Sequence, residues 1–206
     1  MTTCIVAILS SSLNKRKNIK TSLENVSSSS ISSSSKESSS DIISVPSVNP
    51  NNYSSIKTLQ EALSINSDTI GWLYVPGTTL NLPIVQANNN DYYLKKNIYK
   101  NYAWKGWPFA DYNDAFNPLP KNLVIYGHNM GDGDLLGELK KFTNLSFLNS
   151  NPILYFSTPS KKYYWKIFAV YLTDKNFNYI QTNFKENEEF LNFIFNNKAR
   201  SFFNTC

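Results

Sequence analysis

A serine-dominated run from Ser22 to Asn52 is the feature that most limits what this 206-residue chain can fold into. It reads SLENVSSSSISSSSKESSSDIISVPSVNPNN. Such a composition cannot bury enough apolar surface to offset the entropy lost on ordering, so we expect a flexible linker over residues 22–52. Order should begin near Tyr53. The chain therefore divides into residues 1–21, the linker 22–52 and a domain over 53–206.

A short apolar stretch, CIVAIL at residues 4–9, precedes the linker and is followed by serines and the basic run NKRKNIK. A helix that spans a membrane needs about 20 apolar residues, and a secretory signal needs a basic segment before its apolar core. We interpret residues 1–21 as the remnant of a membrane anchor with a basic flank. The linker 22–52 would then hold the domain away from the membrane. The alternative is a marginal surface segment and a tail without a role.

The formal net charge of +5 raises the question of a nucleic-acid partner, but nearly all of the positive charge is lysine. Arg16 and Arg200 are the only arginines, whereas phosphate and base recognition favours arginine. We therefore expect no nucleic-acid binding. The two cysteines, Cys4 and Cys206, lie at opposite ends of the chain and do not make a disulfide framework.

Beyond Tyr53, the pattern predicts a mainly β (α+β) domain, an antiparallel barrel or sandwich with two helices. Apolar residues at helical spacing predict one helix in SIKTLQEALSINSD, and an acidic first turn supports another in KENEEFLNFIFNNKARSFF. Strands are predicted in IGWLYVPG, TLNLPIVQ, NLVIYG, PILYFST and KKYYWKIFAVYLT.

His128 is the only histidine, and it follows the apolar run Leu123 to Tyr126 after one glycine, Gly127. The end of a strand is a rigid mount for a catalytic group, Gly127 adds no bulk beside it, and the following NMGDGD turns the chain away. An imidazole at such a rim suits proton transfer near neutral pH. The alternative is a histidine that only ends a strand. The GDGD sequence lacks the remaining ligands of a calcium loop, so we read it as a turn and expect no metal and no cofactor.

Several spaced motifs resemble class B sortases, the surface transpeptidases of Gram-positive bacteria. NLVIYGHNM resembles the histidine motif of that family, and residues 65–86 resemble its opening strands. NNDYYLKKNIY, KGWPFADYND and NFNYIQTNF follow in the matching order. The resemblance runs from about residue 64 to residue 200.

The resemblance implies a sortase-type antiparallel β-barrel with an N-terminal helix and a helix before the seventh strand. It also implies cysteine transpeptidation: a thiolate attacks the threonine carbonyl of a sorting signal, and an amine of a peptidoglycan cross-bridge or a pilin resolves the acyl-enzyme. A histidine protonates the leaving amine, and an arginine stabilises the oxyanion.

Carried over to this sequence, the resemblance gives His128 the acid/base role. It places Asn90 and Leu94 in the substrate groove, and Tyr179, Ile180 and Thr182 on the loop over the substrate. For each of these groove residues, the alternative is ordinary packing or turn chemistry.

The family nucleophile lies in a Thr-Leu-x-Thr-Cys motif on the seventh strand, and this sequence departs from the pattern there. Cys206 follows a threonine, which makes it a candidate nucleophile, but no apolar strand precedes it and no arginine follows it. Arg200 falls on the preceding helix. We therefore expect a domain that lacks its last strands.

Two functions of different classes follow. One is a cysteine transpeptidase (or hydrolase) at the outer face of the cell membrane, held by the N-terminal anchor. The other is an inactive sortase-like surface module, or a gene fragment, that keeps the peptide groove but lacks the nucleophile.

Overall fold

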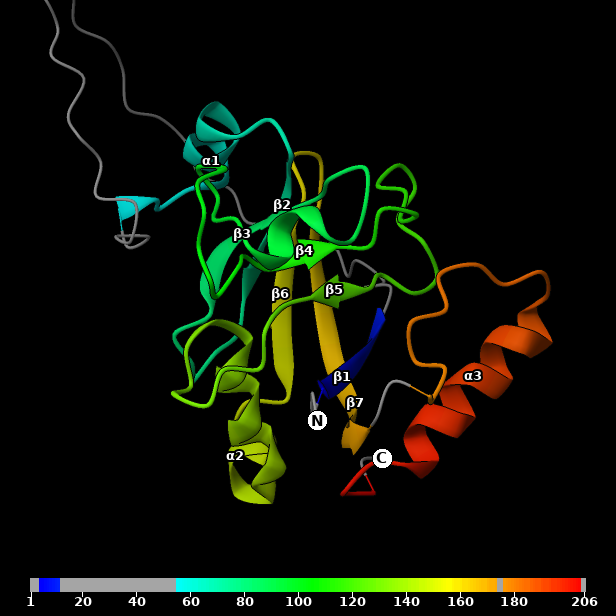
Figure 1. Cartoon of the computed structure of the whole chain (residues 1–206). Helices are drawn as coiled ribbons and strands as arrows, with labels where there is room; N and C mark the ends of the chain where they lie inside the picture. The colour runs from blue at the N-terminus through cyan, green and yellow to red at the C-terminus, as the bar shows by residue number, and fades with distance from the viewer. Residues whose placement is uncertain (1–3, 12–54, 174–175, 205–206) are drawn as a thin grey trace, which may run out of the picture. The chain divides into compact units, whose positions relative to one another are not determined.

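A sheet of seven strands forms the centre of the domain (Figure 1). This computed structural model describes residues 4–11, 55–173 and 176–204, and of residues 4–11 only the backbone. In chain order the strands are β1 (Cys4–Ser11), β2 (Thr69–Tyr74), β3 (Asn81–Val85), β4 (Phe109–Ala110), β5 (Ile125–Tyr126), β6 (Ile153–Ser157) and β7 (Lys162–Thr173).

The strand order across the sheet is β1-β7-β6-β2-β3-β4-β5. The pairs are antiparallel except for β3 and β4, which run parallel with Val85 opposite Phe109. Parallel neighbours cannot be joined by a hairpin and need a crossover connection. Residues 86–108 form that crossover, and the strand β5 lies at the edge of the sheet beyond it.

Strands β2 and β3 form a hairpin because the chain carries the turn residues that the geometry needs. The Thr78 N–H donates to the Val75 carbonyl at 3.3 Å, with Pro76 and Gly77 between them. Gly77 has φ of +76°, a conformation that favours glycine at this position of the turn. Along β2, burial alternates from Thr69 onward, as expected for a strand with one face on the core.

Large apolar side chains from β2, β3, β6 and β7 cover the inner face of the sheet and form the main core. The Phe156 and Trp165 rings stack at 5.0 Å between centroids and 10° between planes. A side chain at Gly71 would collide with the Phe156 ring, so the close approach of β2 to β6 requires glycine there. Fully buried residues of this core include Val75, Leu80, Ile84, Phe156 and Val170.

A second core lies between the helix α1 (Leu59–Ile65) and the crossover. The helix begins with a capping box, in which the Thr58 side chain accepts from the Glu61 N–H and the Glu61 carboxylate accepts from the Thr58 N–H. The buried members of this core are Ile56, Ala62, Val85, Tyr93, Ile98, Trp107, Phe109 and Leu135. This packing fixes the crossover against the sheet.

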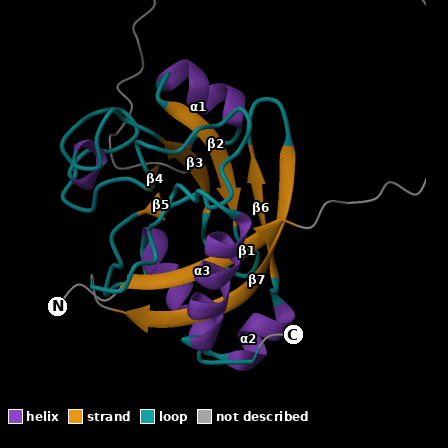
Figure 2. Cartoon of the chain, turned by 90° about the vertical axis from the view of Figure 1, so that its right-hand side faces the viewer, coloured by secondary structure: helices purple, strands orange, loops and turns teal. Residues whose placement is uncertain are grey.

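The remaining helices are η2 (Tyr92–Leu94), η3 (Leu135–Thr143), α2 (Leu145–Ser150) and α3 (Asn187–Ala199). Figure 2 shows α3 lying across β7, where Phe193 packs against Ala169 and Tyr171. The phenol of Tyr171 donates to Asn197 of α3, which joins the helix to the strand.

The two predicted helices and four of the predicted strands are confirmed, within narrower limits. The segment NLVIYG forms a strand only at Ile125–Tyr126, because the backbone before it bonds to Asp111 and Asp114. The short strand β4 was not predicted. The linker 22–52 lies outside the described residues.

The N-terminal apolar stretch forms β1, which pairs antiparallel with β7 from Cys4 opposite Thr173 to Ser11 opposite Trp165. This pairing was not predicted from the sequence. Within the part of the chain that the structure describes, no helix has the length and apolar content needed to cross a membrane. The anchor over residues 1–21 stays a prediction.

Candidate active site

His128 lies two residues after the edge strand β5, where the sequence predicted a rim position. Its imidazole is partly buried, and Nε2 lies 2.9 Å from the carbonyl oxygen of Leu94. A carbonyl oxygen only accepts hydrogen bonds, so Nε2 carries the proton of this bond. In the neutral ring Nδ1 is then the unprotonated, basic nitrogen. No described residue donates a hydrogen bond to Nδ1.

The Leu94 carbonyl is held in place by the second core. Tyr93 is fully buried, and its phenol donates to the Asp68 carboxylate at 2.6 Å. The Trp107 N–H donates to the Tyr93 carbonyl at 2.9 Å. Gly106 has φ of +61°, and a Cβ there would lie 2.6 Å from the Leu94 carbonyl oxygen. The hydrogen-bond acceptor of His128 therefore belongs to a rigid part of the crossover.

The turn after His128 is tied to the crossover by two ion pairs. Lys105 Nζ lies 2.8 Å from carboxylate oxygens of both Asp132 and Asp134. Hydrogen bonds to these two carboxylates raise the pKa of Lys105. Gly133, with φ of +80°, completes the turn. No group of three or more metal-ligating side chains occurs among the described residues.

Both polar atoms of the Asn90 side chain are hydrogen-bonded within the protein. Its Oδ1 accepts from the Tyr112 N–H at 3.0 Å, and its Nδ2 donates to Asp111 Oδ2 at 2.9 Å. The phenol of Tyr126 donates to the same Asp111 oxygen at 2.7 Å. Asn90 is thus joined, through one carboxylate, to the strand that leads to His128.

Tyr179 is partly buried and packs against the cluster beneath α3. Burial raises the pKa of Tyr126 most strongly, the Asp111 hydrogen bond and charge add to this, and the Tyr179 phenol makes a smaller contribution of the same sign. Tyr179 therefore lies close enough to Tyr126 to act on it electrostatically. This small electrostatic effect links one residue of the predicted substrate loop to Tyr126 of β5.

Ile180 and Thr182, the other two predicted loop residues, make no hydrogen bond to His128 in the described part of the chain. Ile180 is 42% exposed, and Thr182 is partly buried. Between them, the Gln181 carbonyl accepts from Asn122 Nδ2 at 2.9 Å, which fastens this loop to the segment leading into β5. The substrate roles of both residues stay predictions.

Arg200 follows α3, and its guanidinium carbon lies 3.8 Å from the centroid of the Phe177 ring. This places the charge in a cation–π contact with a loop residue. Cys206, the candidate nucleophile, lies outside the described residues.

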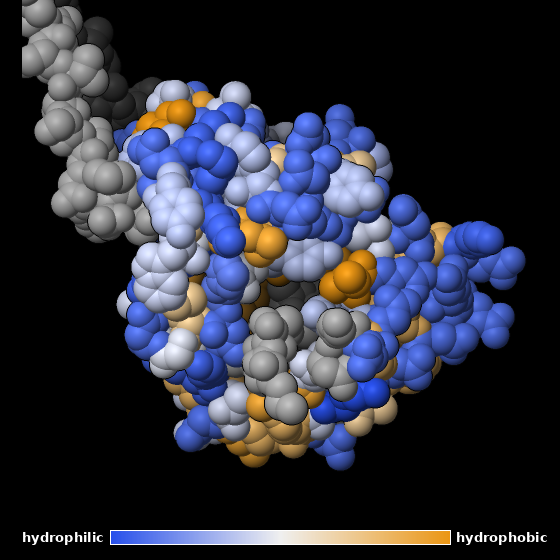
Figure 3. All heavy atoms as spheres, in the orientation of Figure 1, coloured by the Kyte–Doolittle hydropathy of each residue, from blue (hydrophilic) through white to orange (hydrophobic). Residues whose placement is uncertain are grey.

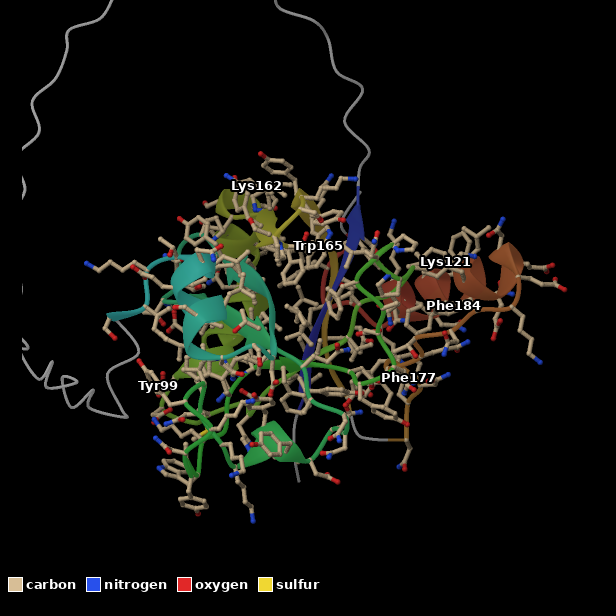
Figure 4. All side chains as sticks on the ribbon, turned by 90° about the horizontal axis from the view of Figure 1, so that it is seen from above. Tyr99, Lys121, Lys162, Trp165, Phe177 and Phe184 are labelled. Atoms are coloured by element: carbon tan, nitrogen blue, oxygen red, sulfur yellow. The ribbon has the colours of Figure 1, made fainter. Side chains whose placement is uncertain are left out.

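A cavity of about 500 Å³ lies between α3 and the loop before it, and none of the predicted site residues lines it. Its walls come from Phe177, Phe193, three glutamates and four amide side chains. In Figure 4, the labelled Phe177, Phe184 and Lys121 lie on the α3 side of the molecule. The cavity is therefore separate from the His128 contact with Leu94.

Figure 3 shows a mostly hydrophilic surface over α3, with small apolar patches and a hollow close to β4 and β5. The residues around His128 that the sequence did not single out are Asp111, Tyr126 and Lys105. For Asp111 and Tyr126, the sequence signal is the placement of polar residues beside apolar runs, in FADYND and VIYGH.

Comparison with known proteins finds sortase B relatives from two bacteria. No family model matches the sequence. Sortase B of Listeria monocytogenes is 37% identical over 143 residues, which cover 69% of this chain and 58% of that protein. Sortase B of Staphylococcus aureus is 31% identical over 141 residues, which cover 68% of this chain and 58% of that protein. The chain thus spans under two thirds of the length of these two relatives.

Solved structures of sortase B share the fold. A complex of Staphylococcus aureus sortase B with substrate matches with a TM-score of 0.69 and 30% identity, over 71% of this chain and 68% of that one. A Bacillus anthracis protein similar to sortase B matches with a TM-score of 0.68 and 35% identity, over 71% and 69%. Clostridium perfringens sortase B matches with a TM-score of 0.68 and 30% identity, over 72% and 81%. The chain belongs to the class B sortase family.

Proposed function

We propose that this protein is a cysteine transpeptidase that cleaves sorting signals after threonine and joins them to an amine of peptidoglycan or of a pilin. The observation that carries the proposal is the hydrogen bond between His128 Nε2 and the Leu94 carbonyl. It fixes the ring at the end of β5 and leaves Nδ1 for proton transfer.

In the proposed reaction, a thiolate attacks the threonine carbonyl and forms a tetrahedral intermediate. The peptide C–N bond breaks, and the departing amine takes a proton from Nδ1 of the imidazolium, while Nε2–H stays bonded to Leu94. A thioester remains. An acceptor amine then attacks the thioester, its proton passes to His128, and the thiolate leaves.

The peptide is proposed to bind beside β5, with Asn90 and Leu94 on one side and Tyr179, Ile180 and Thr182 on the other. The solved complex of a Staphylococcus aureus relative with substrate supports a peptide ligand. Because both polar atoms of the Asn90 side chain are already bonded within the protein, we propose that Asn90 shapes the groove by position. A location at the outer face of the membrane belongs to the same proposal.

The test uses labelled peptides with an Asn-Pro-Gln-Thr-Asn or a Pro-x-Thr-Gly motif, with and without triglycine as the acceptor. Cleavage and transfer should require His128 and one thiol, so His128→Ala, Cys206→Ala and Cys4→Ala are compared with the wild type. Loss in Cys206→Ala but not in Cys4→Ala identifies the nucleophile. Cleavage that survives His128→Ala refutes the proposed role of the imidazole.

The rival function is peptide binding without catalysis. It requires the His128, Leu94 and Asn90 contacts but no thiol. Fluorescence anisotropy with the same labelled peptides separates the two: saturable binding with no cleaved product supports the rival, whereas thiol-dependent cleavage supports the enzyme.

A further inference from the structure

Asp111 is a buried carboxylate, 4% exposed, at the end of β4. Its Oδ1 accepts from the N–H and the amide of Asn113, at 2.8 and 3.0 Å. Its Oδ2 accepts from the Tyr126 phenol and the Asn90 amide, at 2.7 and 2.9 Å. Burial alone would raise the pKa of Asp111, but the bonds from Tyr126, Asn113 and Asn90 outweigh it and hold the pKa below its usual range. Asp111 is therefore ionised near neutral pH.

The two residues on Oδ2 belong to the two segments that meet again at the histidine. Asn90 directly precedes Asp91, the N-cap of η2, and η2 ends at Leu94. Tyr126 ends β5 and is separated from His128 by one glycine. The backbone and three hydrogen bonds thus form one closed circuit. From Asp111 a hydrogen bond leads to Asn90, and the backbone continues through η2 to Leu94. A second hydrogen bond joins Leu94 to His128, the backbone leads back to Tyr126, and a third hydrogen bond returns to Asp111.

A circuit of this kind restrains each of its bonds, because the segments on either side of the His128 contact cannot move independently while Asp111 joins them. The contact itself is single, a bond from Nε2 to one carbonyl. A partly buried imidazole with one bond can rotate or shift by a fraction of an ångström, and catalytic geometry tolerates little of this. The link through Asp111 limits such movement from the segment before His128, as the Lys105 ion pairs do from the turn after it.

We propose that Asp111 is a positioning residue, whose carboxylate joins the Asn90 segment to Tyr126 and so holds the His128 imidazole on the Leu94 carbonyl. Its relevance to catalysis rests on the proposed function. The restraint itself is a property of the folded protein and is measured without turnover.

The chain offers an unusually clean measurement, since His128 is its only histidine. Two-bond ¹H–¹⁵N spectra of the ring, recorded with the imidazole neutral, distinguish a protonated from an unprotonated nitrogen. The wild type should show one dominant tautomer with the proton on Nε2. In Asp111→Asn the two nitrogen shifts should move toward each other, because the amide offers one accepting oxygen to two pairs of donors, which weakens the link between Asn90 and Tyr126.

Three further variants separate positioning from general damage. Asp114→Asn is the matched control: Asp114 is also buried, at 5% exposure, but it lies off the circuit and should keep the wild-type spectrum. Tyr126→Phe removes the bond through which the circuit returns to His128 and should change the shifts in the same direction. Asn90→Asp combined with Asp111→Asn exchanges donor and acceptor between the two side chains, and should restore part of the difference between the shifts.

If the amide spectrum shows that Asp111→Asn is folded and its ring spectrum is still that of the wild type, the proposal is wrong. An equal change in Asp114→Asn overturns it as well, since the effect would then follow from any lost buried carboxylate. Should Asp111→Asn fail to fold, Tyr126→Phe and the double exchange decide the matter by the same spectrum. None of these results depends on peptide cleavage, so failure of the proposed function remains a separate outcome.

Discussion

Asp114 is a buried carboxylic acid with one hydrogen bond in the described structure. Its Oδ2 accepts from the Val124 N–H at 2.9 Å, whereas its Oδ1 is buried without a partner among the described residues. Burial raises the pKa of Asp114 to about 7; the Val124 bond opposes this, and the negative charge of Asp111 adds to it. Folding therefore favours the neutral form of this group.

The sign of the effect on stability follows from proton binding. The unfolded chain releases this proton near the ordinary value of 3.8, and the folded chain keeps it up to about 7. Between these values the folded state binds more protons, so the stability present at low pH is lost as the pH rises. A difference of one in pKa corresponds to about 1.36 kcal/mol. The free energy of unfolding lost between pH 3.8 and about 7 is therefore about 4 kcal/mol at most.

Asp114→Asn should remove this dependence. The amide has the size of the carboxyl and an oxygen that can accept from Val124, but it does not ionise. From pH 5 to pH 8, the free energy of unfolding of the wild type should fall by up to about 3 kcal/mol relative to the variant. Urea unfolding of both proteins at pH 5, 6, 7 and 8 measures this difference.

Asp132→Asn provides the control, because its bond to Lys105 lowers the pKa of Asp132 and confines its titration to more acidic solution. Its difference from the wild type should stay constant over the same range. If the wild type and Asp114→Asn run parallel from pH 5 to pH 8, burial does not keep Asp114 neutral, and the reasoning fails.

Three other substitutions have expected outcomes. Gly106→Ala should cost about 2–4 kcal/mol in urea unfolding, because φ is +61° and the new Cβ would lie 2.5 Å from the Tyr93 carbonyl oxygen, whereas Gly131→Ala, with nothing within 4 Å, should cost well under half as much. Phe156→Ala should cost about 3–5 kcal/mol by the same measurement, and a loss below about 1 kcal/mol would contradict the packing of this core. Lys105→Ala should speed amide hydrogen exchange over residues 127–134 in low salt, and equal rates with the wild type under those conditions would show that the two ion pairs do not restrain this turn.

Much of the sheet could be predicted because its strands carry local signals. β2 alternates in burial along its length, and the Pro76–Gly77 turn sets its hairpin with β3. The helix α1 carries its own capping box at Thr58 and Glu61. Such signals lie within a few residues of one another, so the sequence alone contains them.

The candidate site was predictable only in part, because its contacts join distant segments. His128 was expected at the end of a strand, and the structure places it there, but its bond to Leu94 spans 34 positions. The bonds from Asn90 and Tyr126 to Asp111 span 21 and 15. The strands β4 and β5 are each two residues long, too short for periodicity to reveal the register that brings these groups together.

The parallel pairing of β3 with β4 has a consequence for how such a site can diversify. A hairpin constrains its turn to a few residues, but a crossover can lengthen or shorten at a modest cost in loop entropy while the flanking register stays intact. In this chain the crossover supplies both the acceptor for the imidazole and one wall of the proposed groove. Ligand preference can therefore change by insertion or deletion between residues 86 and 108, while the sheet that carries the histidine remains as it is.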